Sequence, residues 1–145
     1  HQFNKVELFH YTTPEDSYAA LDEIVRQAET ILQRLGLHYR VALLPAGDLA
    51  QQAAKTVDVE VWLPGQDRYY EVSSCSNCEE YQARRGNIRY RPADGGKPRF
   101  VHTLNGSALA TSRLFAALLE QNQQRDGTVV LPPLLADLLG QRSLG

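Results

Sequence analysis

Hydrophobic residues along the chain follow two different periods, and each period predicts a type of secondary structure. Between residues 18 and 35, apolar side chains recur every three or four positions, which predicts an amphipathic helix packed on one face. Thr13 is the expected N-cap and Gly36 the expected end of this helix. The same spacing predicts a second long helix over residues 107–123.

Alternation of apolar and polar residues predicts the strands. The segment Thr56–Leu63 (TVDVEVWL) alternates throughout, and Arg68–Ser74 is predicted to pair with it as the return strand of a hairpin. Further strands are expected at residues 1–9, 39–44, 87–91, 99–105 and 128–131, and short helices at residues 79–85 and after Pro132-Pro133. Several consecutive strands without intervening helices favour antiparallel pairing, so the order predicts one α+β domain with helices flanking an antiparallel sheet.

Composition is that of an ordinary globular protein. The 145 residues are 43% hydrophobic and 22% charged, and the net charge of −2 provides no overall attraction to nucleic acid. No apolar run approaches the roughly 18 residues that a membrane span needs, so we expect a cytoplasmic protein with no membrane partner. The sequence contains no methionine, and we therefore expect it to be part of a longer polypeptide.

The segment Glu71-Val72-Ser73-Ser74 places an acid and two hydroxyls where a strand is expected to end. Such oxygen atoms are suitable Mg²⁺ ligands alongside phosphate and water oxygens. Regular alternation places Glu71 and Ser73 on one face, with Ser74 on the other unless the strand ends there. The alternative is a serine-rich N-cap for the following helix.

Cys75 and Cys78 form a Cys-x-x-Cys pair that invites a zinc or redox interpretation. Structural zinc needs four ligands, and the sequence offers neither a second Cys pair nor a His-x₃₋₅-His motif. A redox motif is expected in a βαβ setting, which this hairpin-rich region is not. We therefore expect two ordinary thiols and no bound metal. The four histidines are scattered, and we assign none a catalytic role.

Asn105-Gly106-Ser107 lies where a strand is expected to pass into a helix. Gly106 would allow a tight turn, and Ser107 would cap the helix while facing a ligand together with Asn105. Arg113, farther along the helix, could point at a bound anion, or could be an ordinary surface residue. Six cations could face phosphates or protect a strand edge: Arg84, Arg85, Arg89, Arg91, Lys97 and Arg99.

Three segments in this order resemble the seryl-tRNA synthetase family: HQFNKVELF, DVEVWLPGQDRYYEVSSCSNCEEYQARR and HTLNGSALATSRLFAALLEQNQQRDG. The resemblance extends from residue 1 to about residue 140. It implies the class II aminoacyl-tRNA synthetase core, an antiparallel sheet flanked by helices. Residues 1–145 would be the C-terminal part of that catalytic domain, from the second strand of motif 2 through motif 3.

The resemblance also implies the roles of individual residues. The serine substrate would be bound by Glu7, Asn105 and Ser107. ATP would be bound by Phe3, Glu71, Val72, Ser73, Ser74 and Arg113. Phe3 would stack on adenine, Arg113 would hold the terminal phosphate, and Glu71 and Ser74 would contact Mg²⁺ bound to ATP. No side chain is implied as a covalent nucleophile, because this chemistry depends on electrostatic stabilisation of the transition state.

The implied activity is that of a homodimeric serine–tRNA ligase, which activates serine with ATP and transfers it to tRNA(Ser). The family carries a tRNA-binding coiled coil, a dimer-forming motif and the first strand of motif 2 before the matching region, so we expect the isolated piece to be inactive. One alternative is a synthetase-like ligase that loads an amino acid onto a carrier protein. Another is a non-catalytic relative acting as a binding module.

Overall fold

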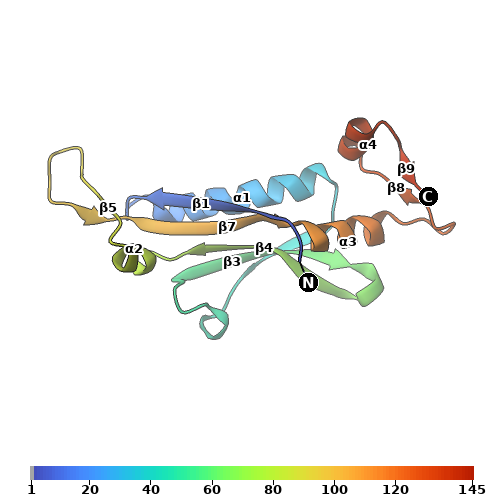
Figure 1. Ribbon diagram of the computed structural model, residues 1–145. Helices are drawn as coiled ribbons and strands as arrows, with labels where there is room; N and C mark the ends of the chain where they lie inside the picture. The colour runs from blue at the N-terminus through green and yellow to red at the C-terminus, as the bar shows by residue number, and fades with distance from the viewer. Residues whose placement is uncertain (1) are drawn as a thin grey trace.

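The computed structural model describes residues 2–145, and its centre is a five-stranded antiparallel sheet (Figure 1). The strand order is β1-β7-β4-β3-β2. The bounds are β1 Lys5–Thr12, β2 Tyr39–Leu43, β3 Lys55–Leu63, β4 Arg68–Asn77 and β7 His102–Ala110. The predicted first strand thus begins and ends later than expected, and its residue 1 lies outside the described residues. The predicted α+β fold is confirmed.

Two long helices, α1 (Ser17–Arg34) and α3 (Thr111–Asn122), pack against this sheet. The core lies between them and the apolar face of β3, where Val59 and Val61 are fully buried. From α1, Leu21 and Leu32 are buried against the same cluster, which confirms the predicted apolar stripe. Burial of such stripes supplies the main stabilisation of a domain of this kind.

The ends of α1 agree only partly with the sequence. The N-cap is Asp16 and not Thr13, whose hydroxyl instead donates a hydrogen bond to Asp16 Oδ2 at 2.6 Å. The predicted N-cap was wrong because this hydroxyl bonds a side chain rather than a free backbone amide. Gly36 follows the helix with φ +64°, the left-handed conformation that the predicted C-terminal glycine supplies.

Strand β7 continues farther than the sequence indicates, and this changes the position of the Asn105-Gly106-Ser107 segment. All three residues lie inside β7, and α3 begins only at Thr111 after the cap residue Ala110. Ser107 is therefore not a helix cap, and Gly106 does not form a tight turn. A Cβ atom on Gly106 would overlap the Ile24 side chain of α1 and lie 3.0 Å from Cys75 Sγ. The glycine is required because α1 lies directly on the strand.

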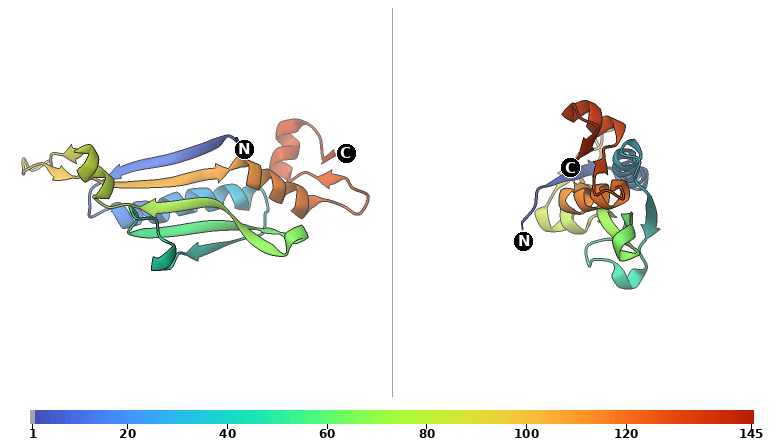
Figure 2. Two further views of the ribbon diagram at one scale, coloured as in Figure 1. Left: turned by 60° about the horizontal axis from the view of Figure 1, so that its bottom comes forward. Right: turned by 90° about the vertical axis from the view of Figure 1, so that its right-hand side faces the viewer.

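Smaller elements extend from the two ends of the sheet (Figures 1 and 2). At one end lie α2 Tyr81–Gly86 and the paired strands β5 Arg89–Tyr90 and β6 Arg99–Phe100. At the other end lie α4 Pro133–Leu139 and the paired strands β8 Val129–Val130 and β9 Ser143–Leu144. Two turns of 3₁₀ helix, Ala46–Asp48 and Pro64–Gln66, complete the secondary structure.

The predicted strand 99–105 is interrupted at Val101, so its first part pairs with β5 and its second part begins β7. Within residues 2–145, no helix is long and apolar enough to cross a membrane.

Candidate functional site

Polar side chains form cross-strand rows on the face of the sheet opposite α1. Glu7 of β1 lies beside Ser107 of β7, and Ser74 of β4 lies beside Asp58 of β3. Glu71 lies beside Glu60 in the neighbouring row. Directly paired residues have Cβ atoms about 4.5–5.5 Å apart, so their side chains can act on the same ligand.

A β-bulge in β4 brings Glu71 and Ser74 to this face together. Val59 pairs with Ser73 while Glu60 pairs with Glu71, which leaves Val72 as an extra residue. Val72 and Ser73 are fully buried, whereas Glu71 and Ser74 remain accessible. The expectation that Glu71 and Ser73 share a face was wrong, because the bulge shifts the alternation by one residue.

Ser73 has a structural contact on the buried side. Its hydroxyl donates a hydrogen bond to the backbone oxygen of Ser107 at 2.6 Å, which joins β4 to β7 beside the polar rows. The side chains of Val72 and Ser73 therefore point away from the accessible face, and any contact that they make with a ligand there comes from their backbone.

Three carboxyl groups, those of Asp58, Glu60 and Glu71, lie on β3 and β4 around the bulge, and Glu60 is paired with Arg40. Asp58 is buried, and its Oδ1 atom has no hydrogen-bond partner among residues 2–145. Burial raises the pKa of Asp58, and the nearby Glu60 raises it further. Burial also raises the pKa of Glu71, with a further rise from Asp58 that Arg113 and Lys5 partly oppose. This group of oxygens therefore favours an added positive charge.

Arg113 approaches the same group from the first turn of α3. Its Nη1 atom donates to the backbone oxygen of Glu71 at 2.8 Å and lies 3.5 Å from Glu71 Oε1. The structure thus brings Arg113 next to Glu71, and both residues are predicted from the sequence to contact ATP. About half of the Arg113 side chain remains exposed, so part of the guanidinium is available to an anion.

Lys5, Glu7 and Ser107 form a second polar group on the neighbouring strands. Lys5 Nζ lies 2.8 Å from Glu7 Oε2 and donates to Ser107 Oγ at 3.3 Å. Ser107 Oγ in turn donates to Glu7 Oε2 at 3.3 Å. Asn105 lies one row away on β7 and faces the same side, where its amide donates to Cys78 Sγ at 3.7 Å. These three predicted serine contacts are therefore neighbours.

Phe3 is more loosely connected to the site. It precedes β1, and its side chain is 51% exposed. The next residue, Asn4, accepts a hydrogen bond from the Thr111 hydroxyl at the start of α3. Phe3 thus lies near the end of α3 that carries Arg113, and about half of it is exposed.

Sequence reasoning missed Asp58, Glu60 and Lys5. The signal was present in TVDVEVWL, where the two acids occupy the polar face of a strand whose other face is valine. Lys5 likewise alternates with Glu7 in the first strand. The acids were overlooked because polar residues on a half-buried strand usually face solvent, and their approach to Glu71 depends on the pairing of β3 with β4.

The Cys-x-x-Cys pair lies at the C-terminal end of β4. Cys75 and Cys78 are both buried and free, and burial raises the pKa of both thiols. In the part of the chain that the structure describes, no group of three or more His, Cys, Asp or Glu residues is placed to hold a metal ion. His102 is buried, and its Nδ1 atom is hydrogen-bonded to the Ser17 hydroxyl of α1 at 2.9 Å.

The oxygens at the bulge are suitable for Mg²⁺ only together with oxygens from a ligand. Glu71 supplies a carboxylate and Ser74 a hydroxyl on one face, and the unpartnered Asp58 oxygen adds negative charge behind them. Mg²⁺ prefers one or two protein carboxylates combined with phosphate and water oxygens. The donor set therefore fits a magnesium–phosphate complex rather than a metal site built by protein alone.

Comparison with known proteins gives a consistent result. Residues 1–122 match the family model described as "tRNA synthetase class II core domain (G, H, P, S and T)". The chain is 58% identical over 135 residues to the serine–tRNA ligase of Thermoanaerobacter pseudethanolicus, covering 93% of this chain and 32% of the relative. It is also 58% identical to that of Prosthecochloris aestuarii, covering 99% of this chain and 33% of the relative.

Solved structures agree with these sequences. A crystal structure of seryl-tRNA synthetase from Pyrococcus horikoshii complexed with ATP superposes with a TM-score of 0.94 at 49% identity, covering 99% of this chain and 32% of that chain. The cytoplasmic serine–tRNA ligase of Naegleria fowleri in complex with AMP superposes with a TM-score of 0.89 at 38% identity. This match covers 99% of this chain and 34% of that chain. The chain spans about a third of the length of these relatives.

Proposed function

Because this chain belongs to the family of class II tRNA synthetase core domains, we propose that it supplies the C-terminal part of the catalytic domain of a serine–tRNA ligase. The observation that carries the proposal is the β4 bulge, which aligns Glu71 with Ser74 beside the row of Glu7 and Ser107. One accessible face thereby offers two groups of polar side chains, a larger one with Glu71, Ser74 and Arg113 and a smaller one with Glu7, Asn105 and Ser107.

The smaller region suits serine. The Glu7 carboxylate can accept hydrogen bonds from the substrate ammonium group, and Ser107 and Asn105 can bond its hydroxyl. Lys5 holds Glu7 at 2.8 Å and so fixes the carboxylate before substrate arrives. A pocket that bonds a substrate hydroxyl discriminates strongly against analogues that lack it, since its own polar groups would be left unpaired.

The larger region suits ATP. Arg113 would contact the terminal phosphate, and the exposed Phe3, which precedes β1 near the start of α3, would stack on adenine. The backbone of Val72 and Ser73 borders this region. Glu71 and Ser74 would hold Mg²⁺, which supplies charge stabilisation on the phosphates when bound.

Serine activation then requires positioning and electrostatics. The serine carboxylate attacks the α-phosphate, and pyrophosphate leaves. Arg113 stabilises negative charge on the departing phosphates, and Glu7 keeps the serine aligned for attack. Holding the two substrates in reactive geometry contributes much of the acceleration in such reactions. The complete protein would then transfer serine to tRNA(Ser), act as a homodimer and work in the cytoplasm.

A chimeric enzyme tests this function. The matching third of the Thermoanaerobacter pseudethanolicus ligase is replaced by residues 1–145, and serine-dependent ATP–pyrophosphate exchange and tRNA(Ser) charging are measured. We expect both activities in the chimera. Glu71→Gln in the chimera should lower exchange by about 10²-fold or more, the typical loss when one preorganised electrostatic group is removed.

The matched control is Glu23→Gln, which neutralises an exposed acid on α1. A chimera that folds as a dimer but shows no exchange, or one in which both Gln variants behave alike, would refute the proposal. Exchange without tRNA charging would instead indicate the carrier-protein type of ligase, and ATP binding without exchange would indicate a non-catalytic relative.

A further inference from the structure

Asp58 of β3 keeps an unpaired carboxyl oxygen beside the bulge. The residue is only 8% exposed, and its Oδ1 atom has no hydrogen-bond partner among residues 2–145. None of the ion pairs within this range involves Asp58. A buried carboxylate without a full set of partners lowers the stability of a fold, so its presence indicates a role other than packing.

The neighbouring cross-strand rows on the same face satisfy their polar groups within the protein. In one row, Thr56 Oγ1 and Ser76 Oγ are hydrogen-bonded to each other at 2.8 Å. In the row on the other side of Asp58, Glu60 forms an ion pair with Arg40 of β2. The unpaired oxygen thus belongs to the Asp58 row and is not a general property of this face.

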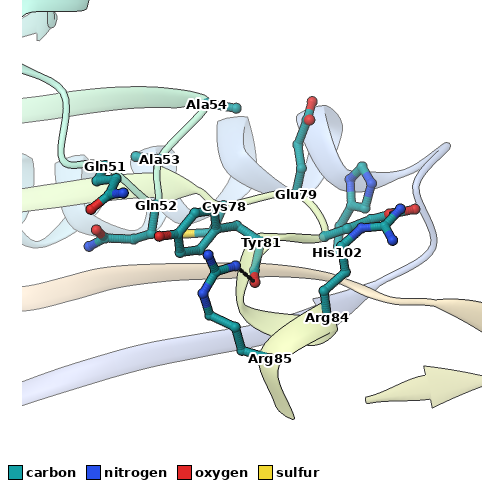
Figure 3. A pocket seen from close by; sticks show the side chains of 11 residues that line it. Gln51, Gln52, Ala53, Ala54, Cys78, Glu79, Tyr81, Arg84, Arg85 and His102 are labelled. Atoms are coloured by element: carbon teal, nitrogen blue, oxygen red, sulfur yellow. Dashed lines mark hydrogen bonds and ion pairs between the residues drawn. The ribbon is translucent and has the colours of Figure 1, made fainter. Parts of the chain in front are cut away.

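The acids of the hollow beside α2 have partners as well. This hollow of about 480 Å³ is lined by Glu79, Glu80 and Arg84, among other residues (Figure 3). Glu79 Oε1 accepts a hydrogen bond from the Tyr18 hydroxyl at 2.7 Å, and Glu80 forms an ion pair with Arg84. Accessible acids in this fold are therefore compensated, whereas the buried Asp58 is not.

Ser74 connects Asp58 to the accessible face of the sheet. The two residues are directly paired across β3 and β4, and the Ser74 hydroxyl hydrogen-bonds the Asp58 carboxyl. A hydroxyl group has one proton and two lone pairs. Because the proton is directed to the carboxyl behind it, both lone pairs of Ser74 Oγ are left for a cation on the open side.

We propose that Asp58 is a positioning residue for metal-bound ATP, which fixes the Ser74 hydroxyl with its lone pairs toward Mg²⁺ and adds negative charge behind it. This inference rests on the proposed function, which supplies the metal-bound nucleotide. Partners behind the ligands of a metal orient those ligands and increase its affinity. No three acids among residues 2–145 are placed to hold a metal by themselves, so Asp58 acts through Ser74 and not as a further ligand.

Removal of the Asp58 charge should have opposite effects on ATP binding with and without the metal. The carboxylate repels the phosphates of metal-free ATP and attracts Mg²⁺. Asp58→Asn should therefore strengthen ATP binding in EDTA and weaken it in Mg²⁺. A variant that only disturbed the packing of β3 and β4 would weaken both, so the direction of the change in EDTA separates the two causes.

Isothermal titration calorimetry on the chimeric ligase, without serine, tests this role. The Kd of ATP is measured in excess Mg²⁺ and in EDTA, and the ratio of the two values gives the increase in affinity that the metal provides. The variants are Asp58→Asn, Ser74→Ala and the double variant. The matched control is Asp67→Asn, the same change at an exposed acid in the turn between β3 and β4. Circular dichroism checks that each variant is folded.

We expect Asp58→Asn to reduce the increase provided by Mg²⁺ by about 10-fold or more, the usual effect of removing a partner behind a metal ligand. Its Kd for ATP in EDTA should fall. Ser74→Ala should also reduce the increase, and the double variant should lose less than the product of the two single reductions, because the residues act as one unit. Asp67→Asn should leave both Kd values unchanged.

Three results would each overturn this role: an unchanged Mg²⁺ effect in Asp58→Asn, weaker ATP binding of that variant in EDTA, or reductions that multiply in the double variant. Failure of the proposed function gives a different result. A chimera with serine-dependent exchange in which Asp58→Asn leaves the Mg²⁺ effect unchanged refutes the role of Asp58 alone. A chimera without exchange in which Asp58→Asn has both expected effects refutes the ligase alone. A folded chimera that binds no ATP refutes both.

Discussion

Replacement of Gly106 by alanine is expected to destabilise the whole domain. An added Cβ atom would overlap the Ile24 methyl group and lie 3.0 Å from Cys75 Sγ. Both neighbours are fully buried, so neither can move outward to make room. Inserting a methyl group into a packed core typically costs about 1–3 kcal/mol. For a chain of this size, that cost corresponds to a fall in Tm of about 2–12 °C.

Thermal and urea unfolding of the isolated chain, followed by circular dichroism, measure this loss. The matched control is Gly47→Ala, since nothing lies within 4 Å of a Cβ atom at that position. The control should change stability by less than about 0.5 kcal/mol. A double-mutant cycle with Ile24→Ala locates the cause. Ile24→Ala alone should cost about 2–5 kcal/mol. The double variant should lose less stability than the sum of the losses measured for the two single variants.

Two results would contradict this reasoning. If Gly106→Ala unfolds at the same temperature as the unmodified chain, α1 does not lie on β7 as closely as described. If the two costs are additive, the destabilisation arises elsewhere, because residues in contact couple by about 0.5–3 kcal/mol. Gly106 lies between Asn105 and Ser107, so the same variant should also weaken serine binding in the chimera.

Four further results are expected. Burial raises the folded-state pKa of Asp58, so the contribution of this carboxyl to stability should fall as pH rises through that pKa. Asp58→Asn should therefore raise Tm at pH 7 but not below pH 4 when measured with EDTA. Ser73→Ala should cost about 1–3 kcal/mol in urea unfolding, because it leaves the Ser107 carbonyl unpaired. Metal analysis of the purified chain should find no stoichiometric zinc at Cys75 and Cys78, and stoichiometric zinc would contradict this. The isolated chain should fold at least partly but fail to charge tRNA with serine, and charging that Arg113→Ala abolishes would show that it needs no further segment.

Sequence periodicity identified the elements whose structure is set by local pattern. The stripe of α1 and the hairpin of β3 and β4 lie where residues 18–35 and TVDVEVWL predict them. Their apolar residues repeat with one period over many positions, and the buried face follows directly from that period. The α+β class then followed from the order of the elements.

Features that depend on distant partners could not be predicted in the same way. The strand bulge at Val72 is set by pairing with β3, and nothing in the letters EVSS distinguishes it from regular alternation. Gly106 suggested a turn because its close neighbour Ile24 is far away in the sequence. The start of α3 was misplaced because Leu109, with φ +81°, continues the strand irregularly where a helical stripe is also compatible.

The bulge at Val72 also affects how this sequence can evolve. Val72 has no opposing residue in β3, so deletion of this one residue would leave Ser73 opposite Val59 and Glu71 opposite Glu60. Glu71 and Ser74 would then share the accessible face through regular alternation of the strand. Lineages that keep the chemistry of this face are therefore expected to keep Glu71 and Ser74 and to tolerate loss of the unopposed residue between them.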